Sequence, residues 1–220
     1  MHFTLTTHWT ITLLTLLTST PTQEPPKSTR TVKDNVLTST EKPALQLKFD
    51  KAFKYIGTQS FILYGVAQAE QHFFVDADEK NQIRRFYWVQ FEGYLPSNNS
   101  AYRYQSKTKA KLGPLEFFAD AGPRNMKAKS RPDSDSAKGQ VFLASKGYKL
   151  VGDDVMTQRL VHLVDDKKRD ELMIIYLENL APLKLTAADL SPGGKAADQW
   201  PGIAEKLLQR SLQGMELVKD

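Results

Sequence analysis

Apolar residues gather in two parts of the chain, and in each part they border a short polar stretch. In the first part, the apolar runs 61–66 and 72–75 are followed by polar Asp76–Gln82 and then by the aromatic-rich run 83–95. In the second part, 164–176, a polar stretch again leads into an apolar run. Runs of β-branched and aromatic residues around a polar turn are typical of β-hairpins. The pattern therefore predicts two antiparallel hairpins.

The two predicted hairpins also resemble each other in sequence. Val75–Tyr87 aligns without gaps with Val164–Tyr176, and three positions are identical. Both an internal duplication and independent convergence on the same turn chemistry explain this similarity, and so few identities favour convergence. Asp76 and Asp165 each open the polar stretch, where a short acidic side chain readily accepts a local backbone hydrogen bond.

Two segments carry signals for helices. Ser134–Lys146 has a polar start and an apolar centre, and Gly147 supplies a left-handed stop. Trp200–Val218 repeats apolar residues at the spacing of one helical face, and Pro201 suits its first turn. Thr186–Asp189 reads as a short capping box. The first two segments are predicted helices, and the second is amphipathic.

These elements indicate an α+β fold. No regular alternation of strand and helix appears, which argues against a parallel sheet. We expect a single antiparallel sheet built from the two hairpins, with helices packed on one face, including the C-terminal amphipathic helix. Residues 45–220 are expected to form this one domain, after a linker at 21–44 that is rich in Thr, Pro and Ser.

The first twenty residues are predicted to direct export. Their apolar segment Trp9–Leu17 is too short and too polar to cross a bilayer but suits a signal peptide. The preceding region lacks Lys and Arg, and Thr18–Thr20 replaces the usual small-residue cleavage site. We interpret 1–20 as a cleaved signal or an N-terminal anchor and expect a periplasmic or secreted protein. The alternative is an extension with no such role.

Composition narrows the range of functions. The 220 residues include no cysteine, which excludes disulfides, thiolate metal sites and cysteine nucleophiles in this chain. Hydrophobic residues make up 40%, as expected of a folded body, and the formal net charge is only +5. Phosphate-loop, dinucleotide and serine-nucleophile motifs are absent from the sequence. We therefore predict no cofactor and lean away from an enzyme.

His72 is the first candidate for chemistry. On a strand, alternation places Glu70, His72 and Asp76 on one face, which brings two carboxylates near an imidazole. Such a group suits a metal-assisted or hydrolase-type enzyme. No third metal ligand is apparent, and the simpler interpretation is a hydrogen-bonded structural histidine, so no metal site is predicted.

A basic segment with interleaved aromatic residues is a second candidate. Basic residues beside aromatic rings suit anionic polymers, and in an exported chain the anion would be a membrane headgroup or a wall polymer rather than nucleic acid. The alternative is a core-packing element, Gly113–Ala119, between two basic loops. The predicted anion-binding residues are Arg103, Lys107, Lys109, Lys111, Arg124, Lys127, Lys129 and Arg131.

The aromatic residues of the first hairpin provide the leading functional hypothesis. They cannot all share one sheet face, and alternation groups Phe86 and Trp88 with Arg84 and Gln90. An apolar face with a polar rim that helices leave partly open would be a binding surface or a pocket. We therefore predict a non-catalytic binding or accessory protein whose partner is an apolar or amphipathic ligand or protein.

Overall fold

The computed structural model describes residues 28–128 and 130–218, and their strands form two sheets. The large sheet has the strand order β4-β5-β6-β11-β10-β8-β7, and β9 (Lys149–Leu150) pairs in parallel with β6 at one end. All other pairings are antiparallel. The large sheet contains β4 (Lys54–Leu63), β5 (Ala67–Ala77), β6 (Gln82–Tyr94), β7 (Thr108–Leu112), β8 (Leu115–Asn125), β10 (Asp154–Leu163) and β11 (Asp170–Asn179). The small sheet contains β1 (Arg30–Lys33), β2 (Val36–Ser39), β3 (Leu45–Phe49) and β12 (Met215–Leu217), in that order.

Both predicted hairpins are confirmed, and they lie in the same sheet. The first joins β5 to β6 and the second joins β10 to β11. The two hairpins meet through their second strands, because β6 pairs with β11. In that register Tyr87 lies directly opposite Tyr176, the residue with which it aligns in sequence. The two hairpins therefore form the centre of the large sheet.

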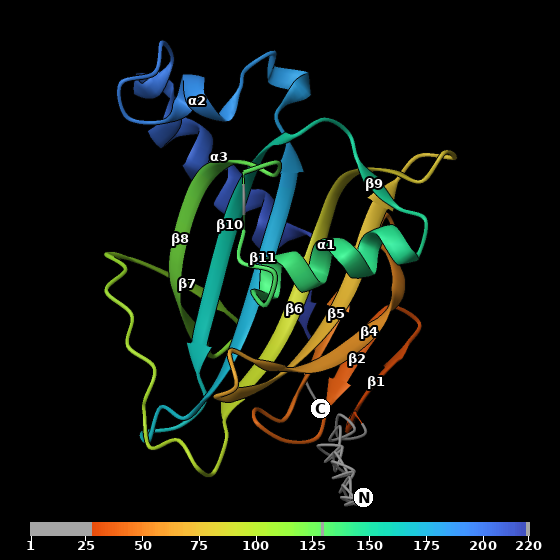
Figure 1. Ribbon diagram of the computed structural model, residues 1–220, viewed down its shortest axis with the longest axis vertical. Helices are drawn as coiled ribbons and strands as arrows, with labels where there is room; N and C mark the ends of the chain where they lie inside the picture. Colours follow the sequence, from red (N-terminus) through yellow and green to blue (C-terminus); the bar gives the residue numbers. More distant parts are fainter. Residues whose placement is uncertain (1–27, 129, 219–220) are drawn as a thin grey trace, which may run out of the picture.

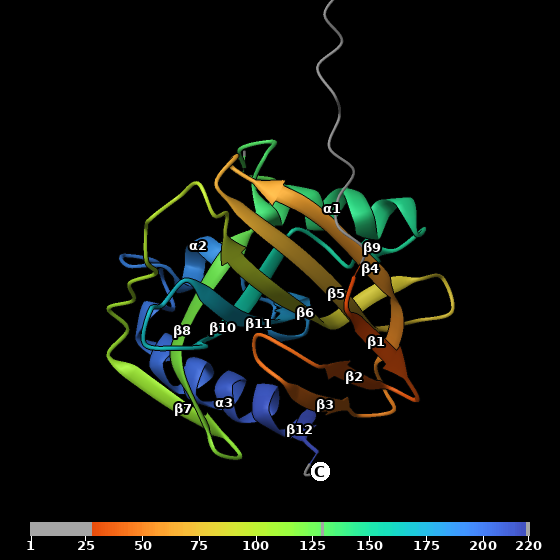
Figure 2. The ribbon, with the colours of Figure 1, turned by 90° about the horizontal axis from the view of Figure 1, so that it is seen from below.

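The large sheet is covered on both faces, by different layers (Figures 1 and 2). Helix α1 (Asp135–Ser145) lies across one face, which we call the α1 face. The small sheet and α3 (Trp200–Gln213) cover the other, which we call the inter-sheet face. The expectation of one sheet with helices on one face was therefore wrong in part. The missing element was the small sheet: β1 and β2 lie in the predicted linker, β3 lies at the start of the predicted domain, and β12 lies in the predicted C-terminal helix.

The expected linker at 21–44 is not a linker over its described part. Residues 28–44 include β1 and β2, which pair with each other, and β2 also pairs with β3. Leu37 is fully buried opposite Leu47. The segment has few apolar residues, but alternation directs Leu37 into the core between the sheets, and neighbouring strands satisfy the backbone. The folded domain accordingly includes residues before 45.

The helices are shorter than expected at the C-terminal end. Helix α1 and its caps match the predicted segment, and α2 (Ala187–Leu190) carries the predicted capping box. Helix α3 ends at Gln213, however, and Met215–Leu217 pairs with β3 as β12. Gly214 makes this change of direction beside the Tyr87 ring, which leaves no room there for a Cβ. Among the described residues, no helix is long and apolar enough to span a membrane.

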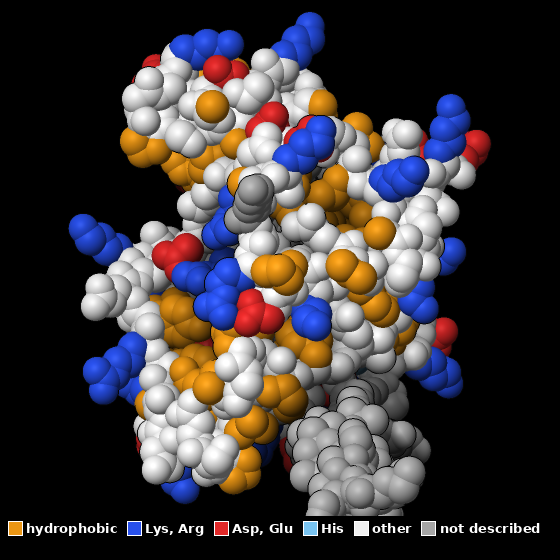
Figure 3. Space-filling model, viewed as in Figure 1, with side chains coloured by type: hydrophobic (Ala, Val, Ile, Leu, Met, Phe, Trp, Pro, Cys, Tyr) orange, Lys and Arg blue, Asp and Glu red, His pale blue; other side chains and the backbone are white. Residues whose placement is uncertain are grey.

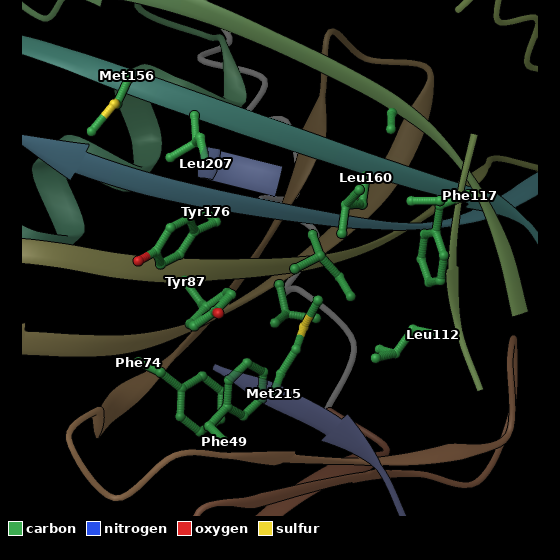
Figure 4. Close-up of a cluster of buried hydrophobic side chains, with 14 of the residues drawn as sticks. Phe49, Phe74, Tyr87, Leu112, Phe117, Met156, Leu160, Tyr176, Leu207 and Met215 are labelled. Carbon is green, nitrogen blue, oxygen red and sulfur yellow. The ribbon is translucent and has the colours of Figure 1, made fainter. Parts of the chain in front are cut away.

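The main core lies between the two sheets and is rich in aromatic residues (Figure 4). Phe49 of the small sheet stacks on Phe74 of the large sheet with ring centroids 3.9 Å apart. The Tyr87 and Tyr176 rings lie 4.7 Å apart, and the Tyr87 hydroxyl donates to the Ser211 carbonyl of α3 at 2.7 Å. One buried cluster therefore joins both sheets and α3.

Candidate functional site

Helix α1 is held against the large sheet by its caps and by one aromatic contact. The Ser134 hydroxyl accepts from the Ala137 amide at 3.2 Å, and Gly147 adopts a φ of 80° after the last turn. Gly139 lets the helix approach Phe73 closely, and Phe142 stacks on the same ring with centroids 4.9 Å apart. These contacts seat α1 over β4, β5 and β6.

A cavity of about 210 Å³ lies between α1, the large sheet and the chain that leaves β8. We call it the α1 cavity. Its apolar wall is contributed mainly by β6, β11 and α1, and includes Phe86, Trp88, Met173, Leu177 and Leu143. On this side of the molecule, hydrophobic side chains gather in a hollow beside α1 (Figure 3). An apolar cavity with a few polar groups is the usual form of a small-molecule site.

Trp88 is part of the cavity wall, and it is only 7% exposed. Its indole Nε1 donates to Gln90 Oε1 at 3.1 Å, which satisfies the one polar atom of the ring. Gln90 is fully buried and donates in turn to Glu92 Oε2 at 2.6 Å, while Gln71 donates to Gln90 Oε1 at 2.7 Å. Of the residues predicted for this face, Phe86 and Trp88 line the cavity, and Gln90 fixes the orientation of Trp88.

Arg84 lies outside this group, which corrects the expectation from strict alternation. Asp76 pairs with Arg85, whereas Ala77 pairs with Ile83, so Arg84 is an extra residue in a β-bulge. The guanidinium groups of both Arg84 and Arg85 bond to Asp76. Ile83 packs with Phe86 and Trp88 in place of Arg84. A bulge shifts the alternation by one residue, and no residue pattern near Arg84 marks this one.

Two carboxyl groups lie opposite each other on the α1 face, next to the Gln90 network. Glu92 of β6 and Glu171 of β11 are direct partners in the register. Tyr102 donates to Glu92 and Tyr104 donates to Glu171, each at 2.7 Å. Burial raises the pKa of Glu171 to about 8; the Tyr104 hydrogen bond opposes this and the Glu92 charge adds to it. Burial also raises the pKa of Glu92. Because the pKa of Glu171 is about 8, the Glu171 carboxyl group is suited to hold a proton at neutral pH.

Arginine side chains and one aspartate supply charge at the α1 cavity. Arg159 of β10 and Arg124 of β8 line it, and Arg159 Nη2 donates to Asp120 Oδ2 at 2.8 Å. Asp135, the first residue of α1, lies on the opposite wall and accepts from the Ser136 amide at 2.6 Å. Burial raises the pKa of Asp135, although that hydrogen bond and the charges of Arg124 and Arg159 oppose the shift. The cavity thus combines an apolar wall with charged groups of both signs.

The His72 cluster occupies the inter-sheet face instead. His72 is 1% exposed, and its Nε2 lies within hydrogen-bond distance of Glu70 Oε1 at 2.6 Å and its Nδ1 of the Tyr55 hydroxyl at 3.3 Å. Arg30 pairs with Glu70 Oε2 at 3.1 Å, and the Ser28 hydroxyl donates to Oε1 at 2.6 Å. Both Glu70 oxygens and both imidazole nitrogens therefore have protein partners.

Asp76 does not join Glu70 and His72, because it is paired with the two arginines of the bulge. The structure brings together two of the three predicted residues and separates the third. Within residues 28–128 and 130–218, no group of three or more His, Asp or Glu side chains is arranged to hold a metal ion. The Glu70–His72 pair instead connects the large sheet to the start of the small one through Arg30 and Ser28.

The predicted anion-binding residues are spread over several parts of the molecule. Lys107 borders β7, Lys109 and Lys111 lie on β7, and Arg103 lies in the segment before it. Lys109 pairs with Glu116, Lys127 with Asp153 and Arg131 with Asp133. Arg124 lines the α1 cavity, and Lys129 lies outside the described residues.

The interleaved aromatic residues are engaged in contacts within the fold, and the Lys109 ammonium lies 3.2 Å from the Phe118 ring centroid. Phe117 is fully buried in the main core. Tyr102 and Tyr104 bond to the carboxyl pair, and Phe118 packs against Tyr104 with centroids 5.6 Å apart. The segment Gly113–Ala119 belongs to a β7–β8 hairpin, so the core-packing alternative describes it better than a stacking platform does.

Several residues of the cavity were not found from the sequence. Met173, Arg159 and Asp135 come from β11, β10 and α1, and they meet Trp88 only because β6 pairs with β11 and β11 with β10. Arg159 carried no clear signal, since the same strand also includes the polar residues Thr157, Gln158 and His162. Comparison with known protein families, with curated proteins and with solved structures finds no match to this chain.

Proposed function

We propose that this protein is a non-catalytic binding protein that takes a small amphipathic ligand into the α1 cavity. The observation that carries the proposal is an apolar cavity, walled by Trp88, Phe86 and Met173, with charged side chains on its walls. Its volume of about 210 Å³ lies below the roughly 300–1,000 Å³ usual for drug-sized ligands. The ligand is therefore small, or inserts only one part of itself.

Binding is favoured over catalysis because the buried polar side chains at His72 already have protein partners, whereas some polar side chains of the α1 cavity have none within the described residues. Glu70 and His72 are buried and bonded to Tyr55, Arg30 and Ser28, so a substrate would have to displace protein contacts to reach them. Their arrangement serves the connection between the sheets. The α1 cavity, in contrast, has polar side chains on its walls that are free to meet a ligand, among them Gln140 and Ser136, which form no side-chain hydrogen bond within the described residues.

The test is to block the cavity without disturbing the core. Trp88 itself is a poor target because, at 7% exposure, its removal would also cost about 3–5 kcal/mol of stability. Gln140 is half-buried on α1 and faces the cavity, so Gln140→Trp would fill it. Val141, the next residue, is 70% exposed, and Val141→Trp is the matched control.

Octanol is a suitable first probe, because it combines a short apolar chain with one polar group. Calorimetric titration should detect binding to the unmodified chain and to Val141→Trp, and should detect at least about tenfold weaker binding to Gln140→Trp, the loss expected when an apolar wall contact is blocked. Equal binding by all three proteins would mean that octanol binds outside the α1 cavity, which would contradict the proposal. Failure of octanol and of its charged analogues to bind at all would overturn the proposal.

A further inference from the structure

Arg159 carries a polar atom that nothing in the described residues satisfies. Its Nη2 is held by Asp120, but its Nε is buried and has no hydrogen-bond partner. Nε is enclosed by protein atoms, so a ligand in the cavity does not reach it. The rest of the group is open, because the Arg159 side chain is 39% exposed on the wall of the α1 cavity and its Nη1 forms no hydrogen bond within the described residues.

The other unpaired polar groups at the cavity are also mainly donors. Arg124 lines the cavity and forms no hydrogen bond or ion pair with the described residues. An arginine offers five N–H donors and no acceptor, and Gln140 adds an amide. The one acidic group on the wall, Asp135, accepts from the Ser136 amide and feels the charges of Arg124 and Arg159, but it forms no hydrogen bond or ion pair with either arginine within the described residues. Two arginines and one carboxyl group therefore leave the cavity with more donors than acceptors.

The apolar wall adds a second requirement. Trp88, Met173 and Leu177 lie on the sheet side of the cavity, and they form a surface for a hydrocarbon chain or ring. Arg159 comes from β10, and its register partner Ile175 on β11 lies opposite Trp88 on β6. The order Trp88, Ile175, Arg159 across three strands gives one end of the cavity an apolar character and the other a cationic one.

We propose that the α1 cavity is a site for amphipathic carboxylic acids, with the carboxylate bonded to Arg159 and the apolar body packed on Trp88. This inference rests on the proposed binding function and names its ligand class. Carboxylate is favoured because the guanidinium fork of arginine matches its two oxygens. Asp120 occupies only Nη2, which leaves Nη1 for an oxygen of the ligand.

The experiment compares octanoate, octanol and octylammonium, which share a chain and differ in charge, by calorimetric titration at neutral pH. Octanoate should bind about tenfold to a hundredfold more tightly than octanol, the ratio expected of a charged hydrogen bond. Octylammonium should bind most weakly. In Arg159→Met the preference for octanoate should disappear, while octanol binding is retained. Arg131→Met is the control, because Arg131 pairs with Asp133 in the loop before α1 and does not line the cavity.

The outcomes separate the two proposals. If octanol and octanoate bind the unmodified chain equally, or octylammonium binds best, the carboxylate inference is overturned and the binding function stands. If none of the three probes binds, both are overturned. Arg159→Lys covers the case in which Arg159→Met fails to fold by circular dichroism. It keeps the charge towards Asp120 but has no guanidinium fork, so it should also lose most of the preference, and a retained preference would contradict the assignment.

Discussion

Tyr87 and Tyr176 lie directly opposite each other on the two central strands, with ring centroids 4.7 Å apart. They occupy the same position in the two similar hairpins, so the sequence similarity maps onto the join between these hairpins. Their hydroxyl groups have different partners: Tyr87 donates to the Ser211 carbonyl on α3, and Tyr176 donates to the Glu178 carboxylate. The two positions are alike in packing and differ in what they anchor.

This difference predicts the effect of Tyr87→Phe. The substitution removes the hydrogen bond to Ser211 and keeps the ring, so it should lower the free energy of unfolding by about 0.5–1.5 kcal/mol. Urea denaturation would measure the change. Tyr64→Phe is the control, since Tyr64 is 43% exposed in the β4–β5 turn and should change stability by less than about 0.5 kcal/mol. Equal effects of the two substitutions would contradict the anchoring role of Tyr87.

The parts of the fold that could be predicted from sequence are those fixed by local contacts. The two hairpins and α1 depend on turn residues and caps such as Ser134 and Gly147, which lie next to the elements that they end. The small sheet depends in part on pairing of 45–49 with 215–217, a long-range contact that leaves little trace in local composition. Its other strands, 30–33, 36–39 and 45–49, pair with their sequence neighbours but are short and hold few apolar residues. A short strand such as β2, in which Leu37 is the one buried apolar residue, therefore resembles a linker.

In the candidate site, too, residues on one strand could be predicted together, and residues on different strands could not. Phe86 and Trp88 were predicted together because they alternate on one strand. Arg159 and Met173 join them only through the strand order β6-β11-β10, which no spacing in the sequence reveals. The bulge at Arg84 had the opposite effect, because it removed a residue that alternation had assigned to the face.

Leu37→Ala tests whether the segment before residue 45 is part of the folded domain. Leu37 is fully buried in the main core, so truncation should cost about 2–5 kcal/mol in the free energy of unfolding. The same substitution at Leu183, which is 44% exposed, should cost less than about 1 kcal/mol. Denaturant unfolding of the two variants gives the comparison. A Leu37→Ala protein as stable as Leu183→Ala would restore the linker interpretation of this segment.

Glu70 should make the protein sensitive to acid. Burial would raise the pKa of Glu70, but the hydrogen bonds from His72 and Ser28 and the charge of Arg30 outweigh burial and lower it. The ionised carboxylate is therefore favoured in the folded protein. Its stabilising effect is present above the ordinary pKa of about 4.3 and is lost as pH falls through the lower, folded value.

The matching experiment compares Glu70→Gln with the unmodified chain over a range of pH. At neutral pH the variant should be less stable by about 3–5 kcal/mol, because Arg30 and His72 lose a buried anionic partner. The deficit should shrink as pH falls below about 4. Glu79→Gln, in the exposed turn of the first hairpin, should show no such trend. A deficit at Glu70 that is constant with pH would mean that the carboxylate charge is not what matters.

The export hypothesis concerns residues 1–20, which lie outside the described residues, and we retain it as a proposal. If the segment is a cleaved signal, the mature chain should begin between Ser19 and Lys27, and the protein should be recovered outside the cytoplasm. N-terminal sequencing of the native protein measures this directly. Recovery of an intact Met1 from the soluble cytoplasmic fraction would remove the export hypothesis and leave the cavity proposals unaffected.

Glu171 should produce a pH dependence of the opposite sign to that of Glu70. It is 2% exposed, it faces Glu92 across the strand pair, and burial raises its pKa to about 8. The folded protein therefore keeps a proton that the unfolded chain loses above about pH 4.3. Where the folded state binds more protons, stability falls as pH rises, so Glu171 should destabilise the fold progressively between about pH 4.3 and 8.

Glu171→Gln isolates this effect, because glutamine has nearly the same shape and cannot ionise. Its amide can also accept the hydrogen bond from Tyr104, so at pH 4 the variant and the unmodified chain should be of similar stability. At pH 9 the variant should be more stable, by on the order of 1–3 kcal/mol, since one pKa unit corresponds to about 1.4 kcal/mol and solvent relaxation reduces the full effect. Urea unfolding at both pH values measures the difference, and Glu116→Gln on the exposed side of β8 provides the control. A Glu171→Gln variant that is equally destabilised at pH 4 and pH 9 would show that the carboxylate is ionised and paired throughout, and that the Glu92–Glu171 pair does not hold a proton.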